Sequence, residues 1–433
     1  MDLLPDDLLT VVLGRLTPFS LAESRCVRKS WCDIIDTRRL LRANLLPVRL
    51  DGFFLIEDVP CLTPIRHFFS RPSTGCKISS HLDFLRDEIP LHDCLWISDH
   101  CNGLLFLSET FVVNPATRQW VSLPPFPEPW VGMEEFDFNF FLAYDPMVSP
   151  HFEVVLIPLV PSIRYTIEFK EESEWPPSPF TTYVFSSRRW RWEERSFVRE
   201  GKAAGTIADM RCRFDEDPRL RHAVYLRGAL YVHCQNDAVM RMTLWNDKYQ
   251  MIKSPTKNNG SNQGVVCLGK SQKGVYCASI SQENSWPRLR VWLLNESGSE
   301  MEWILKSDVS LQTIVENFPS AYTDRCNMPW ILNDNNDTCE AWTEDELEWD
   351  FERGIVLHET NDDKTTTCNK SVFFLGFHPY KEIVFLAGSL SRVVSYHLNS
   401  SKVQELGILN RGYIVKSYPY TPSWMEFENN CSS

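Results

Sequence analysis

The stretch FVVNPATRQWV at residues 111–121 has the form of a strand, a polar turn and a second strand. Valine and aromatic residues favour strands, whereas Asn, Pro and Thr favour the turn between them. Four later segments have the same form, around polar turns that begin near Ser186, Asn246, Asn295 and Asn399. Most spacings between these turns are near that of a propeller blade, and the last is about twice as long. The pattern therefore predicts a repeated β domain.

Five repeats are visible directly, and the wide last spacing predicts a degenerate repeat within residues 307–370. The expected fold is mainly β with a small N-terminal α module, and the β part is a β-propeller of about six blades. A pair of β-sandwiches is the structural alternative. Trp120, Trp192 and Trp303 recur at matching positions, and we expect them to pack between blades rather than face a ligand. The acidic run at residues 344–348 is expected to be a surface loop.

The composition excludes several classes of protein. The chain has 433 residues, of which 43% are apolar and 23% charged, so it can form a sizeable core. Its net charge of −13 argues against broad nucleic-acid binding. No run of 18 apolar residues and no signal peptide is found, so we expect no membrane partner. The 14 Cys are then expected in a reducing compartment, cytoplasmic and/or nuclear.

The first 45 or so residues have helical periodicity. Pro5 suits the first turn of a helix, and Ser20 with Glu23 has the spacing of a capping box. The second helix is predicted to continue to about Asp36. Three short helices bury little by themselves, so this apolar stripe is either packed within the chain or binds another protein. The stripe of the first helix comprises Leu8, Leu9, Val12, Leu13 and Leu16.

The sequence has few features of common catalytic sites. The sequence lacks G-x-S-x-G, G-x-G-x-x-G and H-E-x-x-H, and its ten His are scattered. No C-x-x-C occurs, and the irregular Cys spacing favours buried thiols over a zinc site. The basic run at residues 188–192 alternates Arg and Trp, which suits a strand better than a site for single-stranded nucleic acid. We therefore predict no catalytic residue, no metal and no cofactor.

Two regions resemble known families. The segments 4–9, 12–16, 20–21 and 27–31 match, in order and spacing, the F-box pattern that begins Leu-Pro and ends in Val-x-Lys-x-Trp. Arg28 departs from this pattern, because the family often has Cys there. The remainder resembles the F-box-associated region of plant F-box proteins, which is thought to form a kelch-like propeller. That resemblance is carried by residues 101–105, 114–120, 144–146, 184–187, 192–193, 227–231 and 291–294.

The resemblance implies a substrate-recognition subunit of an SCF-type E3 ubiquitin ligase. Its F-box would bind a Skp-type adaptor and, through it, a cullin–RING scaffold, while the propeller binds a target protein for ubiquitination. A ubiquitin-independent propeller scaffold and a propeller hydrolase are the alternatives. The expected domains are an F-box at 1–45, a linker and propeller closure segment at 46–94, the propeller at 95–420 and a C-terminal tail at 421–433. The implied adaptor-binding residues are Leu4, Pro5, Leu8, Leu9, Leu13, Leu16, Ser20, Leu21, Val27 and Trp31.

Overall fold

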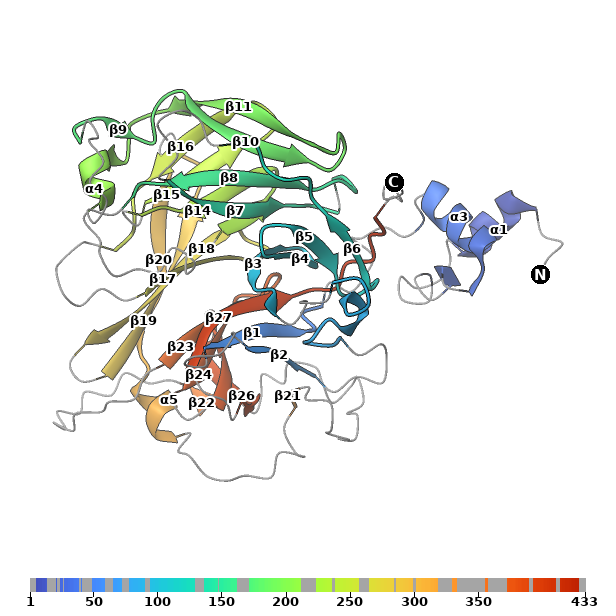
Figure 1. The fold of residues 1–433 in the computed structure, drawn as a ribbon. Helices are drawn as coiled ribbons and strands as arrows, with labels where there is room; N and C mark the ends of the chain where they lie inside the picture. Colours follow the sequence, from blue (N-terminus) through green and yellow to red (C-terminus); the bar gives the residue numbers. More distant parts are fainter. Residues whose placement is uncertain are drawn as a thin grey trace.

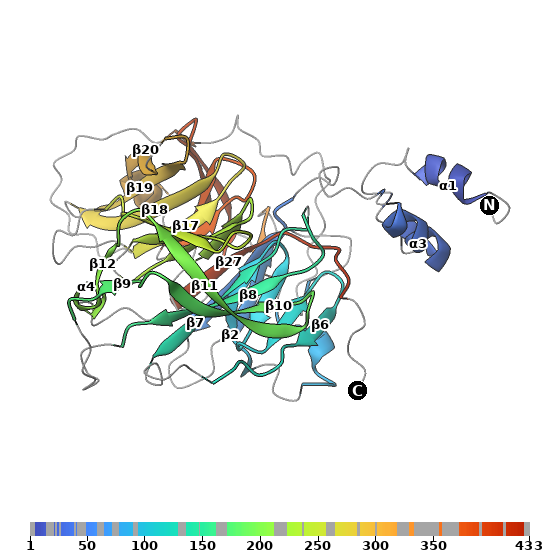
Figure 2. The same ribbon diagram turned by 90° about the horizontal axis from the view of Figure 1, so that it is seen from above.

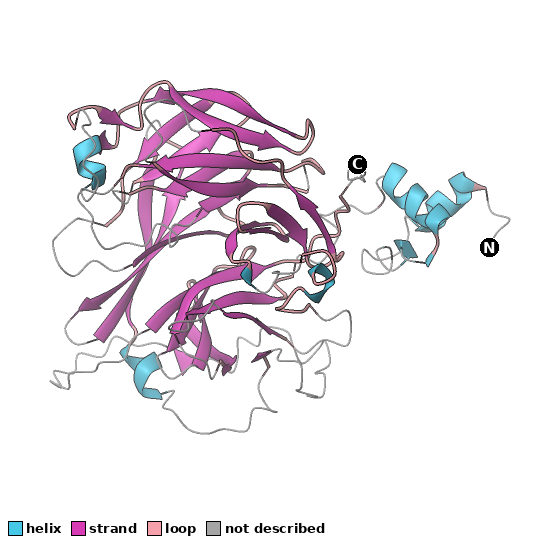
Figure 3. Cartoon of the chain, viewed as in Figure 1, coloured by secondary structure: helices cyan, strands magenta, loops and turns pink. Residues whose placement is uncertain are grey.

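A large ring of strands and a small helical module, which lies at one side of the ring, make up the chain (Figures 1 and 3). The computed structural model describes residues 5–13, 21, 24–25, 27–38, 40, 49–58, 65–71, 78–89, 94–128, 136–146, 148–161, 171–211, 223–235, 238–256, 265–283, 286–298, 301–317, 329–332, 355–356, 372–388, 392–409 and 413–427. The acidic run at 344–348 lies outside these residues.

The strands form six four-stranded blades, numbered I to VI here. Blades II and III share one sheet, because residues 198–200 of one pair in parallel with residues 248–250 of the other. Blade I consists of β3 (Ile97–Cys101), β4 (Leu104–Leu107), β5 (Phe111–Asn114) and β6 (Gln119–Ser122), and blade II consists of β7 (Asp137–Ala143), β8 (Glu153–Leu159), β10 (Phe180–Ser186) and β11 (Arg191–Glu200). Blade III consists of β13 (Ala223–Leu226), β14 (Ala229–His233), β15 (Val239–Thr243) and β16 (Lys248–Ile252), and blade IV consists of β17 (Val265–Lys270), β18 (Val275–Glu283), β19 (Trp286–Asn295) and β20 (Glu302–Ser310). Blade V consists of β23 (Val372–Phe377), β24 (Ile383–Gly388), β25 (Arg392–His397) and β26 (Lys402–Ile408), extended by β22 (Ile355–Val356), and blade VI consists of β27 (Tyr413–Tyr420), β1 (Gly52–Asp58), β2 (Ile65–Ser70) and β21 (Ile331–Leu332).

Short elements lie between the blades. The strands β9 (Glu174–Trp175) and β12 (Gly205–Thr206) pair with each other beside helix α4 (Ile207–Arg211). Helix α5 (Gln312–Asn317) follows blade IV, and a 3₁₀ turn, η2 (Asp83–Leu85), precedes blade I. The first strands of neighbouring blades lie side by side, since β3 adjoins β7, β13 adjoins β17, and β23 adjoins β27. The view from above shows the helices α1 and α3 to one side of the strands (Figure 2).

Blade VI closes the ring with strands from distant parts of the chain. β27 pairs with β1 in antiparallel register, with Gly52 opposite Tyr420. The sixth blade is therefore not a degenerate repeat within residues 307–370, and that prediction was wrong. Beyond residue 317, the described residues of that range supply only the short edge strands β21 and β22. A search for repeats along the sequence cannot find a blade whose strands come from both sides of the other five.

The polar turns that revealed the repeats share one backbone feature. In blades I, II, III and V, the fourth residue after the third strand has a positive φ, between 53° and 56°. This left-handed conformation lets a short turn return the chain to the next antiparallel strand. The residues concerned are Arg118, Trp190, Asp247 and Ser401.

The repeated Trp residues pack between blades, as expected. Trp192, on the outer strand of blade II, packs against the buried cluster shared with blade I, and its indole N–H donates to the Pro124 carbonyl at 2.9 Å. Trp303 of blade IV repeats this arrangement, donating to the Lys253 carbonyl beyond blade III at 2.9 Å. Trp120 packs against the cluster between blades I and VI.

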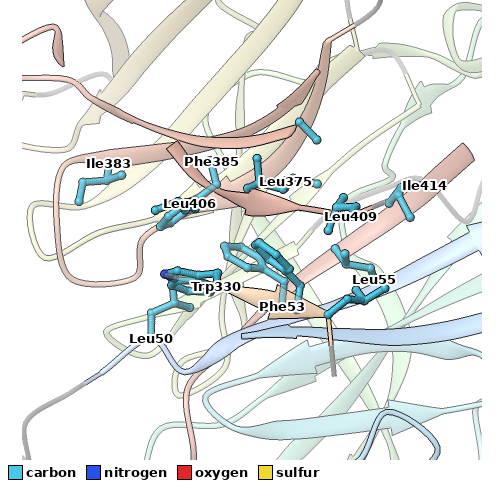
Figure 4. Packing of buried hydrophobic residues seen from close by; sticks show 14 residues of the cluster. Leu50, Phe53, Leu55, Trp330, Leu375, Ile383, Phe385, Leu406, Leu409 and Ile414 are labelled. Atoms are coloured by element: carbon cyan, nitrogen blue, oxygen red, sulfur yellow. The ribbon is translucent and has the colours of Figure 1, made fainter. Parts of the chain in front are cut away.

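A buried cluster joins blades V and VI (Figure 4). Trp330, which precedes β21, packs against both Phe53 of β1 and Phe385 of β24, with ring centroids 5.8 and 6.4 Å away. Its backbone N–H donates to the Leu406 carbonyl at 2.9 Å. The range 307–370 thus contributes a core residue between two blades rather than a blade of its own.

The helical module contains α1 (Asp6–Leu13) and α3 (Lys29–Thr37). Residues 21, 24, 25 and 27 are also helical. Arg28 is extended, with φ −153° and ψ 146°, and caps α3. The predicted helix from Ser20 to Asp36 is therefore interrupted at Arg28.

Candidate functional site

The inner face of α1 forms the core of the helical module. Leu9 and Leu13 lie four residues apart, so they share one face of the helix. They are 6% and 1% exposed and pack against Leu21 and Ile35. Trp31 is half-buried against the same cluster. The structure places Leu9, Leu13 and Leu21 in this core, and their role in adaptor binding, like that of Trp31, stays a prediction.

A second apolar face of α1 points to solvent. Leu8, Val11 and Val12 lie at i, i+3 and i+4, and the exposed fractions of Leu8 and Val12 are 54% and 42%. Together these three residues are called the apolar strip below. The predicted stripe combined two faces, because Leu8 and Leu9 are neighbours in sequence but point apart on a helix.

The other predicted adaptor residues divide into two groups. Pro5 and Val27 are exposed, and the Pro5 carbonyl accepts the first helical hydrogen bond from the Leu9 N–H at 3.0 Å. Their role in adaptor binding stays a prediction. Leu4, Leu16 and Ser20 lie outside the described residues.

The half-buried guanidinium of Arg25 connects two helical segments of the module. Arg25 donates from Nε and Nη2 to the two carboxylate oxygens of Asp36, both at 2.8 Å. Partial burial would raise the pKa of Asp36, but the hydrogen bonds and charge of Arg25 outweigh it and lower this pKa. Hydrogen bonding to Asp36 likewise raises the pKa of Arg25. The same guanidinium reaches Glu426, with Nη1 and Oε1 3.2 Å apart.

Residues 421–427, called the C-terminal strap below, lie along blade I. The fully buried Asn114 donates from Nδ2 to the carbonyls of Ser423 and Met425, at 3.0 and 2.8 Å. Gly103 has φ +91°, and a Cβ there would lie 2.6 Å from the Ser423 backbone nitrogen. Glycine is therefore required where the strap crosses. The tail expected at 421–433 is thus built into the propeller over its described residues.

A cavity of about 220 Å³ occupies the centre of the propeller. The inner strands β3, β13, β17, β23 and β27 supply its walls. Lys270 ends β17, and its ammonium donates to Asn102 Oδ1 at 2.6 Å and to the Tyr225 carbonyl at 3.1 Å. Lys416 of β27 approaches the Ser98 carbonyl at 3.4 Å. The cavity is therefore flanked by two cations.

Burial controls the ionisation of two other groups in the cavity wall. It raises the pKa of Asp99 to about 7, although hydrogen bonds from Leu142 and His100 and the charge of Lys416 oppose this shift. Burial also lowers the pKa of His100 to about 3, and the charges of Lys270 and Lys416 lower it further. His100 is therefore neutral near pH 7, and Asp99 is only partly ionised.

One motif in this wall was missed in the sequence. Residues 264–271 read GVVCLGKS and fit the spacing G-x-x-x-x-G-K-[ST], which is typical of a phosphate-binding loop between a strand and a helix. Here 265–270 form the extended strand β17, which pairs along its length with β18. The backbone N–H cradle of such a loop is thus missing from these described residues. The pattern nevertheless includes Lys270, the residue that places a cation in the cavity.

Metal-binding clusters and membrane-spanning helices are both absent from the part of the chain that the structure describes. No three His, Cys, Asp or Glu side chains gather there in a way that could hold a metal ion. Among the same residues, no helix has the length and apolar character needed to cross a membrane.

Two family models match the chain. An F-box domain model matches residues 1–43, and a model described as "F-box protein At3g26010-like, beta-propeller" matches residues 77–324. The chain is therefore an F-box protein, with its F-box at the N-terminus and a propeller after it. The propeller model covers more than half of the chain, so the chain belongs to the At3g26010-like F-box propeller family. The kelch-like description of the propeller stays a prediction.

Two relatives from Arabidopsis thaliana are similar in sequence. "Putative F-box protein At1g46840" is 28% identical over 75% of this chain and 61% of its own length. "Putative F-box protein At1g30920" is 28% identical over 36% of this chain and 42% of its own length. The chain thus spans about half of the length of these relatives.

Similar solved structures include prolyl oligopeptidase B from Galerina marginata, with 8% identity and a TM-score of 0.27 over 80% of this chain and 33% of that one. The complex of KlAtg21 with the coiled-coil of AgAtg16 gives 10% identity and a TM-score of 0.30, over 86% and 96%. TM-scores this low support no conclusion about function.

Proposed function

We propose that this protein is a substrate-recognition subunit of an SCF-type E3 ubiquitin ligase. The F-box binds a Skp-type adaptor that a cullin–RING scaffold carries, and the propeller binds the target protein. The match of residues 1–43 to the F-box domain carries this proposal. It is supported by an apolar strip that the module's own core leaves uncovered.

The apolar strip is the part of the F-box best suited to bind the adaptor. Leu8, Val11 and Val12 are exposed, whereas Leu9 and Leu13 of the same helix pack into the module's core over the described residues. Removing apolar surface from water stabilises a complex by about 25 cal/mol per Å², and central apolar residues dominate such interfaces. Adaptor binding through these three residues would leave the fold of the module unchanged.

The propeller contributes by position rather than by chemistry. Ubiquitin transfer needs a target lysine held near a thioester that another subunit provides, and such positioning lowers the barrier by itself. A receptor therefore needs no catalytic residue, metal or cofactor of its own. The reducing compartment expected from the Cys content, cytoplasmic and/or nuclear, fits this role.

The test is adaptor binding by the full chain, measured by titration calorimetry with a purified Skp-type adaptor and by co-purification with the cullin. Wild type is expected to bind, and the double variant Leu8→Asp/Val12→Asp is expected not to bind. Val198→Asp on β11 is the matched control, because it places the same charge on an exposed apolar position of the propeller. No binding by wild type, or equal binding by the double variant, would contradict the proposal.

Two alternatives predict different outcomes. A ubiquitin-independent scaffold would capture its target without recovering adaptor or cullin. A propeller hydrolase would turn over a substrate, and its activity would survive deletion of the F-box.

A further inference from the structure

Over the described residues, the central cavity is lined by polar groups whose hydrogen-bonding capacity is only partly used, which is unusual for buried groups. We propose that this cavity binds a small organic monoanion, a carboxylate with a compact apolar body, whose carboxylate pairs with Lys270. The cavity lies in the propeller, whereas the apolar strip lies on α1, so this proposal does not depend on the proposed function.

The size of the cavity limits the ligand. The cavity volume is about 220 Å³. Pockets for drug-sized ligands begin at roughly 300 Å³. The cavity is therefore small for a ligand pocket and best suits a single ring or a short branched chain.

Lys270 supplies the charge that the ligand would neutralise. Its two hydrogen-bond acceptors, Asn102 Oδ1 and the Tyr225 carbonyl, are both neutral, and an ammonium has three N–H donors. Among the described residues, no carboxylate lies within ion-pair distance of Lys270. A ligand carboxylate would take the third donor and compensate the charge.

Two buried polar atoms of the cavity wall also have unused hydrogen-bonding capacity. The Nδ1 of His100 and the Oγ of Ser417 are buried, and neither forms a hydrogen bond within the described part of the chain. Both residues line the cavity, on β3 and β27. The His100 ring is enclosed by protein yet keeps some accessible surface, as expected of a side chain that faces an internal cavity. Buried polar atoms normally have a partner, and a bound ligand with its waters would provide one.

Another part of the cavity wall is apolar. Val372, Phe374 and Phe377 of β23 line it, together with Ile280 of β18. Asp99 lies in the same wall but forms no ion pair with Lys270 among the described residues, and its Oδ2 accepts a hydrogen bond from the Leu142 N–H at 2.7 Å. A cation, a polar wall and an apolar wall together define an amphipathic anion as the ligand.

The experiment uses the full-length protein with three probes of nearly equal size: benzoate, neutral benzamide and cationic benzylamine. Binding is measured by saturation-transfer NMR with titration. Benzoate is expected to bind at least tenfold more tightly than either of the other two. Lys270→Met should weaken benzoate binding at least tenfold, and Lys270→Arg should restore most of it. Lys202→Met is the control for the loss of one charge, because Lys202 is exposed and lies outside the cavity; it should bind as wild type does.

Methyl chemical shifts of wild type keep the test valid if Lys270→Met fails to fold. Benzoate is expected to shift the methyl signals of Val372 and Ile280 and leave that of exposed Val198 unchanged. The proposal is overturned if benzoate does not bind, if benzamide binds equally well, if folded Lys270→Met binds as wild type does, or if the cavity methyls do not shift.

Discussion

Arg25 of the helical module and Glu426 of the C-terminal strap form an ion pair that links the two parts of the molecule, with Nη1 and Oε1 3.2 Å apart. Arg25 is held by Asp36 within its own module, so its position does not depend on Glu426. The strap is held in turn by Asn114 of blade I. The F-box and the propeller are therefore joined by side-chain contacts at the strap as well as through the chain before β1.

Glu426→Gln should loosen the orientation of the F-box relative to the propeller. Glu426 is half-exposed, so the pair contributes only about 0.5–1 kcal/mol. The distance distribution between spin labels on α3 and blade I should broaden, while the melting of the propeller stays unchanged. Asp7→Asn is the control, because it breaks the exposed Asp7–Arg38 pair inside the module. An unchanged distribution in Glu426→Gln would show that the ion pair does not orient the module.

Leu8→Asp should weaken adaptor binding without unfolding the F-box. Loss of the apolar contact and burial of a charge should together cost at least about 2 kcal/mol, or roughly 30-fold in affinity. Leu9→Asp is a poor test, since it places the charge in the module's core. Circular dichroism and calorimetry of the two variants separate the cases. If Leu8→Asp binds normally, the apolar strip is not the docking surface.

Asn114→Ala should release the strap. Two carbonyls and the Ala116 N–H, which donates to Asn114 Oδ1 at 3.1 Å, would lose their partner. Unsatisfied buried groups cost about 1–3 kcal/mol each, and we expect a total loss of about 2–4 kcal/mol. Urea unfolding measures this loss, and hydrogen exchange should increase at residues 421–427. Exposed Asn399 offers the matched control, since Asn399→Ala should change stability by less than about 0.5 kcal/mol.

Asp99 should make stability depend on pH. Its pKa is raised to about 7 in the folded protein and is about 4 when unfolded, so the folded state binds more protons between these values. Stability should therefore fall as pH rises from about 4 through 7, by about 3–4 kcal/mol at 1.36 kcal/mol per pKa unit. Asp99→Asn should remove this loss and be more stable than wild type at pH 8, in urea unfolding at pH 5.5 and 8. Asp87→Asn, at an exposed position, should leave the difference between the two pH values unchanged.

The repeats were predictable because each blade repeats the same local signals. The turns after Asn114, Ser186, Thr243 and His397 use polar residues and one left-handed residue, and these preferences act within a few positions. The inter-blade role of Trp192 followed from its repeated place in the pattern.

Long-range relations were not predictable. Asn114 binds carbonyls more than 300 residues away, which nothing near it in the sequence indicates. Which of Leu8 and Leu9 is buried depends on how α1 packs, because both fit the same apolar stripe. The cavity is assembled from strands of five blades, so Lys270 and Lys416 line the same cavity only once the ring is closed.

Closure by blade VI also determines the order in which the F-box and the propeller are completed during synthesis. The helical module and β1 leave the ribosome first, and β27 follows only after the other five blades have been made. Until then the β1 edge that β27 will cover is unpaired, and unpaired edges are where chains aggregate or recruit chaperones. A nascent chain can thus present a finished F-box long before it has a finished propeller. A chain truncated before Tyr413 would keep the helices but lack the strand that closes the ring.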